Sequence, residues 1–181
     1  SMVETLVQAA RELNFRSVNL DLVYGLPHQA AESFSQTLAQ VVTLDPDRIS
    51  LFSYAHLPER FAAQRKIPDA ALPGASEKLA LLALALETLQ QAGFVAIGMD
   101  HFAKATDPLC QAQQARTLTR NFQGYSVDSC DALLGLGVSA ISQVGNLIWQ
   151  QQKELKHYYQ ALEQQQILAI DKGLTLSRDD Q

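Results

Sequence analysis

The sequence predicts an α/β fold in which helices alternate with strands of a parallel sheet. Apolar residues recur at helical spacing in three segments, and a short strand-like run follows each of them. Gly, Pro, Asn or Asp residues separate the helical segments from the strand-like runs. The resulting order of helix, strand, helix, strand, helix, strand is typical of right-handed crossover units on a parallel sheet.

The first helix is predicted over residues 3–13, with Asn14 as a left-handed stop. The strand that follows, over residues 17–23, alternates between apolar and polar side chains, and Asn19 and Asp21 lie on its polar face. Strands covered by helices on both sides are normally apolar on both faces. A polar face therefore indicates that this strand borders a barrel lumen or a cleft.

Two further helix–strand units are predicted after the first strand. Gly25-Leu26-Pro27 breaks the first strand, and a helix is predicted over residues 31–44, followed by a strand over residues 48–54. A longer loop leads to Ser76, a natural N-cap, and the third helix ends at Gly93 before a strand over residues 94–98. The apolar stripe expected on this third helix comprises Leu79, Leu82, Leu86 and Leu89.

The regular alternation stops after Asp100. Residues 101–116 are predicted to form a loop, and residues 117–127 and 136–144 to be extended, with a turn at Gly145-Asn146. A polar helix is predicted over residues 153–165, and a further element begins near Gly173. We therefore expect the chain to be a piece of a larger protein.

Composition excludes several classes of function. The net charge of −5 and the pI near 5.3 argue against nucleic acid or an anionic membrane as the main partner. No apolar run reaches the length of a membrane span and no signal peptide is visible, so a cytoplasmic location is expected. Cys110 and Cys130 match neither a zinc pattern nor a disulfide framework. Since a four-iron cluster needs three or four thiolates, we expect no metal ligands in this chain.

Polar and aromatic residues gather where the three predicted strands end, which is where parallel α/β sheets collect their ligands. The groups at these ends lie at Asp21 to Gly25, at Tyr54 to His56 and at Gly98 to His101. Their coincidence supports a binding site more strongly than any single residue does.

Four short motifs carry a resemblance to a known family. They are Asn19-Leu20-Asp21-Leu22-Val23-Tyr24-Gly25-Leu26-Pro27, Tyr54-Ala55-His56-Leu57-Pro58, Gly98-Met99-Asp100-His101-Phe102 and Arg120-Asn121-Phe122-Gln123-Gly124-Tyr125. Together they resemble the oxygen-independent coproporphyrinogen III oxidases (dehydrogenases), which are radical S-adenosylmethionine enzymes of haem biosynthesis. The cluster-binding C-x-x-x-C-x-x-C run of that family is absent. A sister group of haem-chaperone-like proteins usually has Asn-Leu-Asn-Tyr where this chain has the oxidase form, Asn-Phe-Gln-Gly-Tyr.

The resemblance implies a fold and an activity. The fold is a partial (β/α) barrel of radical-SAM type over residues 1–100, an active-site loop and extended segment over 101–146, and a helix and connection toward a missing C-terminal domain over 147–181. The activity of the parent enzyme is oxidative decarboxylation of two propionates of coproporphyrinogen III to vinyls, giving protoporphyrinogen IX by 5′-deoxyadenosyl radical chemistry. The parent uses two S-adenosylmethionine molecules, a [4Fe-4S] cluster, and an electron donor and acceptor of unknown identity. The isolated fragment is expected to be inactive.

The resemblance also implies roles for individual residues. Asp21 and Ala55 are expected to bind the second S-adenosylmethionine. Ile141 is expected to bind the first, cluster-bound molecule. Catalytic positions near substrate and cofactor are expected at Phe122 and Gln123. Weaker candidates for binding the substrate, whose four propionates require basic groups, are Asp100, His101 and Arg120.

Other interpretations were weighed against this one. His56, His101 and Asp100 could form the metal site of an α/β-barrel hydrolase, and His56 or His101 could be the axial ligand of a non-catalytic haem-binding module. The pattern at Gly135-x-Gly137-x-x-Ala140 formally meets the dinucleotide fingerprint, but no helix is predicted after it, so we reject it. A barrel fragment also leaves an open sheet edge, through which the chain is expected to self-associate.

Overall fold

A computed structural model of the chain describes residues 1–122, 124–127, 132–164 and 169–180, which fall into two compact units. The first unit is Ser1–Leu118 and the second is Thr119–Gln181, and each is described by itself. None of the helices in the described ranges has both the length and the apolar character needed to cross a membrane.

The first unit contains four α-helices and a four-stranded sheet. Its elements are α1 (Met2–Glu12), β1 (Asn19–Tyr24), α2 (Ala31–Leu44), β2 (Arg48–Ser53), two short 3₁₀ turns (Ala62–Lys66 and Asp69–Ala71), α3 (Ala75–Gln91), β3 (Phe94–Gly98), β4 (His101–Lys104) and α4 (Pro108–Ala115). The predicted helices and strands up to residue 98 are confirmed to within two residues, and Asn14 has the expected left-handed φ of 59°. The predicted N-cap of α3 is wrong by two positions, because the carboxylate of Glu77 accepts the Gly74 N–H at 2.7 Å and starts the helix earlier.

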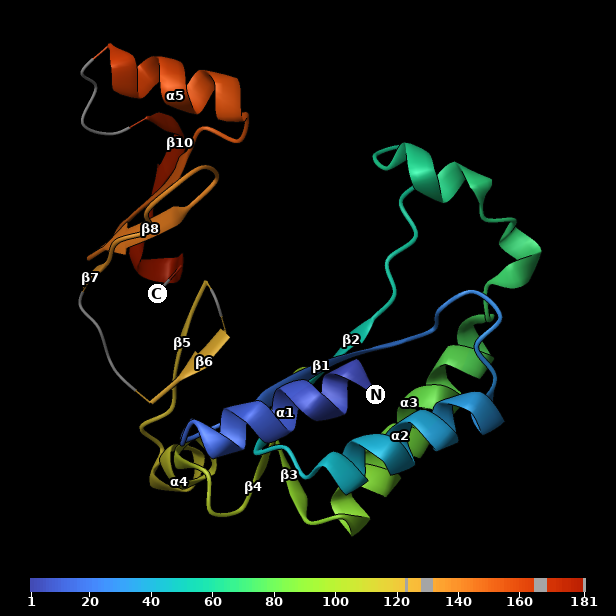
Figure 1. Ribbon diagram of the computed structural model, residues 1–181. Helices are drawn as coiled ribbons and strands as arrows, with labels where there is room; N and C mark the ends of the chain where they lie inside the picture. Colours follow the sequence, from blue (N-terminus) through green and yellow to red (C-terminus); the bar gives the residue numbers. More distant parts are fainter. Residues whose placement is uncertain (123, 128–131, 165–168, 181) are drawn as a thin grey trace. The chain divides into compact units, whose positions relative to one another are not determined.

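The sheet has the strand order β1-β2-β4-β3 (Figure 1). β1 and β2 pair in parallel, as predicted, but β3 does not join β2 directly. β4 lies between them and is antiparallel to both neighbours. The loop predicted over residues 101–116 is therefore wrong. The chain reverses through Met99, whose φ is 47°, and a four-residue strand is too short to show a clear period in the sequence.

The second part of that wrongly predicted loop is helix α4. Its N-cap is Asp107, whose carboxylate accepts the Leu109 N–H at 2.8 Å, and Pro108 occupies the first helical turn. The Asp107-Pro108 pair is thus a helix-start signal inside the segment that was predicted to be a loop.

α2 and α3 pack side by side on one face of the sheet (Figure 1). The core between them is made of large apolar residues from both helices and from the strands, namely Phe34, Leu38, Val41, Ile49, Leu51, Leu81, Ala85, Leu89, Phe94 and Phe102. The stripe predicted for α3 is only partly right: Leu89 is buried, but Leu79 is 67% exposed. The helix is rich in leucine all round, so the sheet surface that it contacts, rather than the pattern, selects the buried face.

α1 is tied to the sheet through the carboxylate of Asp47. Arg11 Nη1 lies 2.7 Å from Asp47 Oδ2, and the same oxygen accepts the Val18 N–H at 2.7 Å. Burial by itself raises the pKa of Asp47. The hydrogen bonds from Val18 and Arg11 and the positive charges of Arg11 and Lys104 act in the opposite direction and leave the pKa below its ordinary value of 3.8.

The second unit is built from antiparallel strands and one helix. Its elements are β5 (Thr119–Asn121), β6 (Gly124–Ser126), β7 (Ala132–Leu133), β8 (Ile141–Val144), β9 (Leu147–Gln151), α5 (Leu155–Glu163), β10 (Ile170–Thr175) and a 3₁₀ turn (Arg178–Asp180). β5 and β6 form an antiparallel hairpin within residues 117–127, which were predicted to be extended, and the predicted turn at Gly145-Asn146 joins β8 to β9. The sheet order β10-β9-β8-β7 shows that the sequence reading missed β9 and β10 as strands.

The burial pattern of α3 gives a matched pair of core variants. We expect Leu89→Ala to lower the free energy of unfolding by about 2–5 kcal/mol, because it leaves a cavity among packed side chains. Leu79→Ala, the same change on the exposed side of the same helix, should alter it by less than about 0.5 kcal/mol. Urea unfolding of both variants followed by circular dichroism checks this. Equal losses would show that the buried face of α3 is misassigned.

The lowered pKa of Asp47 predicts how stability depends on pH. Because the folded-state pKa lies below that of the unfolded chain, the ionised carboxylate stabilises the fold at neutral pH, and this stabilisation is lost as pH falls through the folded-state pKa. Asp47→Asn should therefore destabilise the chain at about pH 7 and cost progressively less below about pH 4. Urea titrations across that range measure the difference, and a difference that stayed constant would contradict the assignment.

Candidate functional site

The face of the first sheet that turns away from α2 and α3 carries a row of polar side chains. Asp21 on β1 lies opposite Ser50 on β2, and Ser50 lies opposite His101 on β4. Residues directly opposite one another in a sheet share a face, so the three side chains form one row across three strands. The polar face that the alternation around Asp21 predicted is thereby confirmed.

Hydrogen bonds between neighbouring side chains orient the carboxylate of Asp21. Asn19 Nδ2 donates to Asp21 Oδ1 at 2.7 Å, and Ser50 Oγ donates to Asn19 Oδ1 at 3.3 Å. Ser50 is buried while Asp21 is exposed, so this chain of contacts runs from the sheet interior to an accessible carboxylate. Sequence reasoning missed Ser50, because a single serine in an apolar strand gives no signal by itself.

An apolar strip borders the polar row toward the carboxyl ends of β1 and β2. Val23 pairs with Phe52, and both side chains are more than a third exposed. The ring of His101 meets the ring of Phe52 edge to face, with centroids 6.4 Å apart. The surface thus offers a carboxylate and an imidazole beside an exposed aromatic ring, which suits a ligand that is part polar and part flat.

The opposite end of this face is closed by α4. Arg48 Nε lies 2.9 Å from Asp107 Oδ2, and Asp107 is almost fully buried as the N-cap of the helix. Ala103, which pairs with Arg48 on this face, is completely buried.

The loop after β1 is held by the side chain of Gln29. Its Oε1 accepts the Gly25 N–H at 2.6 Å and the Leu26 N–H at 3.3 Å, and its Nε2 donates to the Val23 carbonyl at 3.3 Å. Gly25 has a φ of +79°, and a Cβ there would lie 2.9 Å from Lys78 Cε. Lys78 Nζ in turn donates to the Tyr54 carbonyl at 3.3 Å, so one lysine of α3 contacts the loops after both parallel strands.

The loop after β2 is held by a second glutamine. Gln64 Nε2 donates to the Ala55 carbonyl at 3.0 Å, and Gln64 Oε1 accepts the Leu57 N–H at 2.6 Å. Ala55 itself is exposed, and the ring of His56 lies 6.1 Å from that of Tyr54. Asp21 lies in the middle of β1, and Ala55 lies in the loop two residues beyond the end of the adjacent parallel strand β2.

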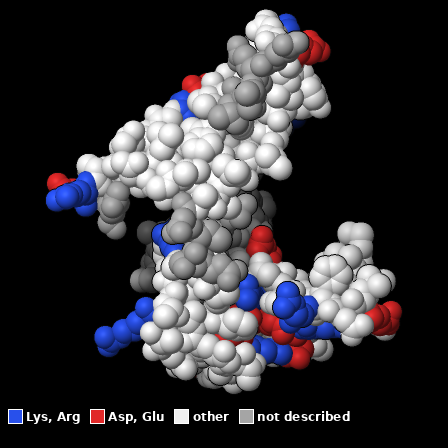
Figure 2. Space-filling view, turned by 90° about the vertical axis from the view of Figure 1, so that its left-hand side faces the viewer, with Lys and Arg blue, Asp and Glu red and all other residues white. Residues whose placement is uncertain are grey.

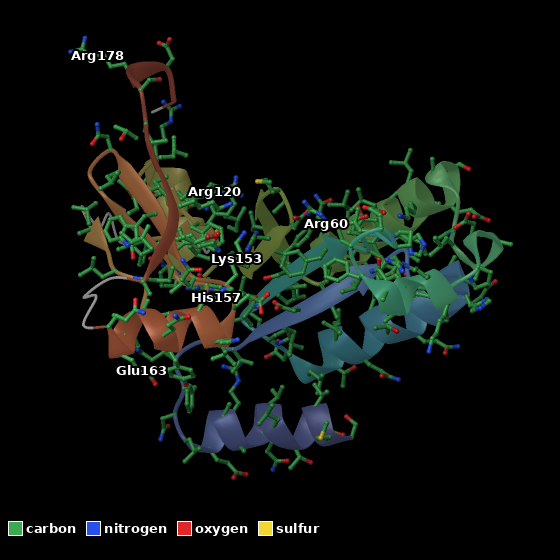
Figure 3. The ribbon with its side chains drawn as sticks, turned by 90° about the horizontal axis from the view of Figure 1, so that it is seen from above. Arg60, Arg120, Lys153, His157, Glu163 and Arg178 are labelled. Carbon is green, nitrogen blue, oxygen red and sulfur yellow. The ribbon has the colours of Figure 1, made fainter. Side chains whose placement is uncertain are left out.

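The β5–β6 hairpin of the second unit carries another group of predicted residues. The guanidinium of Arg120, which Figure 3 labels, lies 5.7 Å from the centroid of the ring of Tyr125, its partner across the hairpin. Phe122 is 67% exposed at the hairpin turn. Gln123 lies outside the described residues.

Ile141 lies on the other sheet of the second unit, at the start of β8. It lines a mainly apolar hollow of about 230 Å³ together with side chains of β9 and β10, the lining residues being Ile141, Ile148, Trp149, Gln150, Lys172, Gly173 and Leu174. β8 and β9 contain no charged residue, and Lys172 of β10 is the charged residue among those that line the hollow. Figure 2 shows where the charged side chains lie on one face of the molecule. An apolar wall at Ile141, as expected for a residue beside a flat adenine, is compatible with this hollow.

The glycine pattern before β8 has a packing role. A Cβ at Gly135 would lie 2.5 Å from the carbonyl oxygen of Ile141, and the Gly135 N–H donates to Ser142 Oγ at 3.0 Å. Strand β8, not a helix, follows Ala140. The rejection of a dinucleotide fingerprint at these glycines is confirmed.

The described residues offer no cluster of three or more His, Cys, Asp or Glu side chains able to hold a metal ion. His56, Asp100 and His101 accordingly do not form the trio that a metal-dependent hydrolase would need. The thiol of Cys110 is buried inside α4, and Cys130 lies outside the described residues. The described chemistry therefore does not fit an iron–sulfur cluster, which requires several thiolates close together.

Comparisons with known proteins confirm the resemblance seen in the motifs. No protein-family model matches the chain. The chain is 53% identical over 175 residues to the oxygen-independent coproporphyrinogen III oxidase of Salmonella typhimurium, a match that covers 97% of this chain and 38% of that protein. It is 51% identical over 176 residues to the enzyme of the same name from Pseudomonas aeruginosa, with the same coverage.

A solved structure agrees with these relatives. The chain matches coproporphyrinogen III oxidase (HemN) from Escherichia coli, described as a radical SAM enzyme, with a TM-score of 0.94 and 52% identity over 98% of this chain and 41% of that chain. The expected α/β fold of radical-SAM type is thereby confirmed. The chain spans only about two fifths of the length of the relatives that it matches.

Proposed function

We propose that this chain, a homologue of the oxygen-independent coproporphyrinogen III oxidases along nearly its whole length, is a segment of such an enzyme. The proposed activity of the whole protein is the oxidative decarboxylation of two propionates of coproporphyrinogen III to vinyls, giving protoporphyrinogen IX. The observation that carries the proposal is 51–53% identity across 97% of the chain to relatives of that name. An electron donor and an electron acceptor are proposed as further partners, and a cytoplasmic location stays a prediction.

The cofactors proposed for the whole protein are S-adenosylmethionine and a [4Fe-4S] cluster, whose ligands we place outside this segment. When bound in the whole protein, they would supply the radical chemistry of the proposed decarboxylation. The described part of this chain contributes position and surroundings rather than the redox step.

The polar face of the first sheet supports the proposed binding of S-adenosylmethionine. The carboxylate of Asp21, oriented by Asn19, can accept hydrogen bonds from ribose hydroxyls or pair with the ligand's ammonium group. Ala55, in the loop that follows the paired strand β2, is proposed to contact the same molecule. Ile141, beside the hollow in the second unit, is proposed to contact the other S-adenosylmethionine.

The residues proposed to contact the substrate are given for each unit by itself. Phe122 and Gln123 are proposed catalytic positions near substrate and cofactor. His101, in the row with Asp21, and Asp100 beside it are proposed substrate contacts, and Arg120 would pair with a propionate while its guanidinium stays over Tyr125. The Asp100 carbonyl accepts the Leu51 N–H at 2.7 Å, which ties the backbone next to His101 to β2.

The proposal is tested by substitutions in the full-length protein. Asp21→Asn and Gln123→Ala should each lower vinyl formation at least about a hundredfold, because each removes a group that positions a reacting molecule, while the iron content stays normal. Glu87→Gln, a loss of one carboxylate on α3, is the matched control and should keep full activity. Product analysis by chromatography, with iron determination, gives the readout. Full activity of both site variants would remove these residues from the site.

We also propose that the isolated chain associates with itself. β1 pairs only with β2 among the described strands, so its other edge presents unsatisfied backbone groups. Sedimentation velocity over a hundredfold range of concentration should show a shift toward dimers or larger species. A monomer at every concentration would overturn this proposal.

A further inference from the structure

The two hydrogen bonds of Gln64 fix the orientation of two consecutive peptide groups. The Gln64 carboxamide donates to the Ala55 carbonyl and accepts the Leu57 N–H, so it hydrogen-bonds to the backbone on both sides of His56. The Leu57 carbonyl is itself an acceptor for the Arg60 and Phe61 N–H groups at 3.0 and 2.9 Å. Figure 3 labels Arg60 in this loop. The loop therefore holds its shape through local hydrogen bonds.

Because peptide groups are planar, the two hydrogen bonds of Gln64 also fix the directions of the backbone N–H and carbonyl of His56. In a trans peptide the C=O and the N–H point in opposite directions, and the chain has no cis peptide bond among its described residues. Since the Ala55 carbonyl points toward Gln64, the N–H of His56 points away from Gln64. Since the Leu57 N–H points toward Gln64, the carbonyl of His56 also points away. Gln64 thus acts like a neighbouring strand on one side of His56.

On the side away from Gln64, the backbone of His56 presents one donor, its N–H, and one acceptor, its carbonyl. Neither the N–H nor the carbonyl of His56 takes part in a hydrogen bond within the described part of the chain, although the imidazole lies near Asp69, 3.9 Å away. Backbone groups of this kind are strong hydrogen-bonding groups that seek partners. They lie three residues beyond Ser53, the last residue of β2, in the loop that follows the strand paired with β1.

We propose that Gln64 is a positioning residue that presents the backbone N–H and carbonyl of His56 to the edge of an adenine ring. Adenine offers an amino donor beside a ring-nitrogen acceptor, which is the complement of this pair. The inference rests on the proposed function, because the nucleoside would be that of an S-adenosylmethionine bound near Asp21 and Ala55. It adds a residue and a recognition chemistry that the resemblance did not supply.

Hypoxanthine provides a sharp probe of this recognition, because it replaces the amino donor with a carbonyl acceptor. A site built on hydrogen bonds rejects a ligand that leaves its polar groups unpaired. In the full-length protein we expect S-adenosylhomocysteine to bind at least about tenfold more tightly than S-inosylhomocysteine. Isothermal titration calorimetry with each compound measures the ratio.

Variants of Gln64 should reduce that ratio in a graded way. Gln64→Ala removes both contacts and should bring the ratio close to one. Gln64→Glu keeps the acceptor for the Leu57 N–H but loses the donor to the Ala55 carbonyl, so an intermediate ratio is expected. Gln36→Ala, on the exposed side of α2, is the control and should keep the native ratio. A role of Gln64 in stability alone would lower the unfolding midpoint and leave the ratio unchanged, which would overturn the proposal.

The same measurements separate this inference from the proposed function. If the unmodified full-length protein forms no vinyl product, the proposed function fails. If it forms product but the Gln64 variants keep the native ratio, only the role of Gln64 fails. A native ratio near one would likewise contradict readout by the His56 backbone.

Discussion

The register between β1 and β2 is the constraint on which the described site depends. One face of this parallel pair packs under α2 and α3 through Leu20, Leu22, Ile49 and Leu51. A slip of one residue would turn the carboxylate of Asp21 into that core and bring leucine side chains to the polar face. Burial of these four apolar side chains therefore fixes the register of the two strands, and with it the position of the polar row.

The conformations of the loops that follow β1 and β2 are held by side-chain hydrogen bonds and not by further strand pairing. Gln29 holds the loop after β1, Gln64 holds the loop after β2, and Lys78 contacts both. Each of these three side chains satisfies backbone groups that the sheet leaves open where its strands end. The edge of the sheet that carries the candidate site is thus shaped by long side chains from the surrounding helices and turns.

Much of the first unit could be predicted from the sequence, because its helices are long and its strands are bounded by Gly and Pro. The polar face at Asp21 was visible from strict alternation alone. The antiparallel insertion of β4 was not, since a four-residue strand with two buried residues carries too little pattern. Gln64 was also missed, because its hydrogen bonds reach seven and nine residues back along the chain and nothing in the local sequence marks them. Lys104, at the end of β4, pairs with Asp45, the residue that ends α2.

The ion pair between Arg48 and Asp107 gives the polar face of the first unit a direction. It joins the start of β2 to the first turn of α4, so this end of the face is covered, and Ala103 beside it is completely buried. Asp21, Val23 and Phe52, which follow along the strands, stay exposed. The accessible part of this face therefore lies toward the carboxyl ends of β1 and β2.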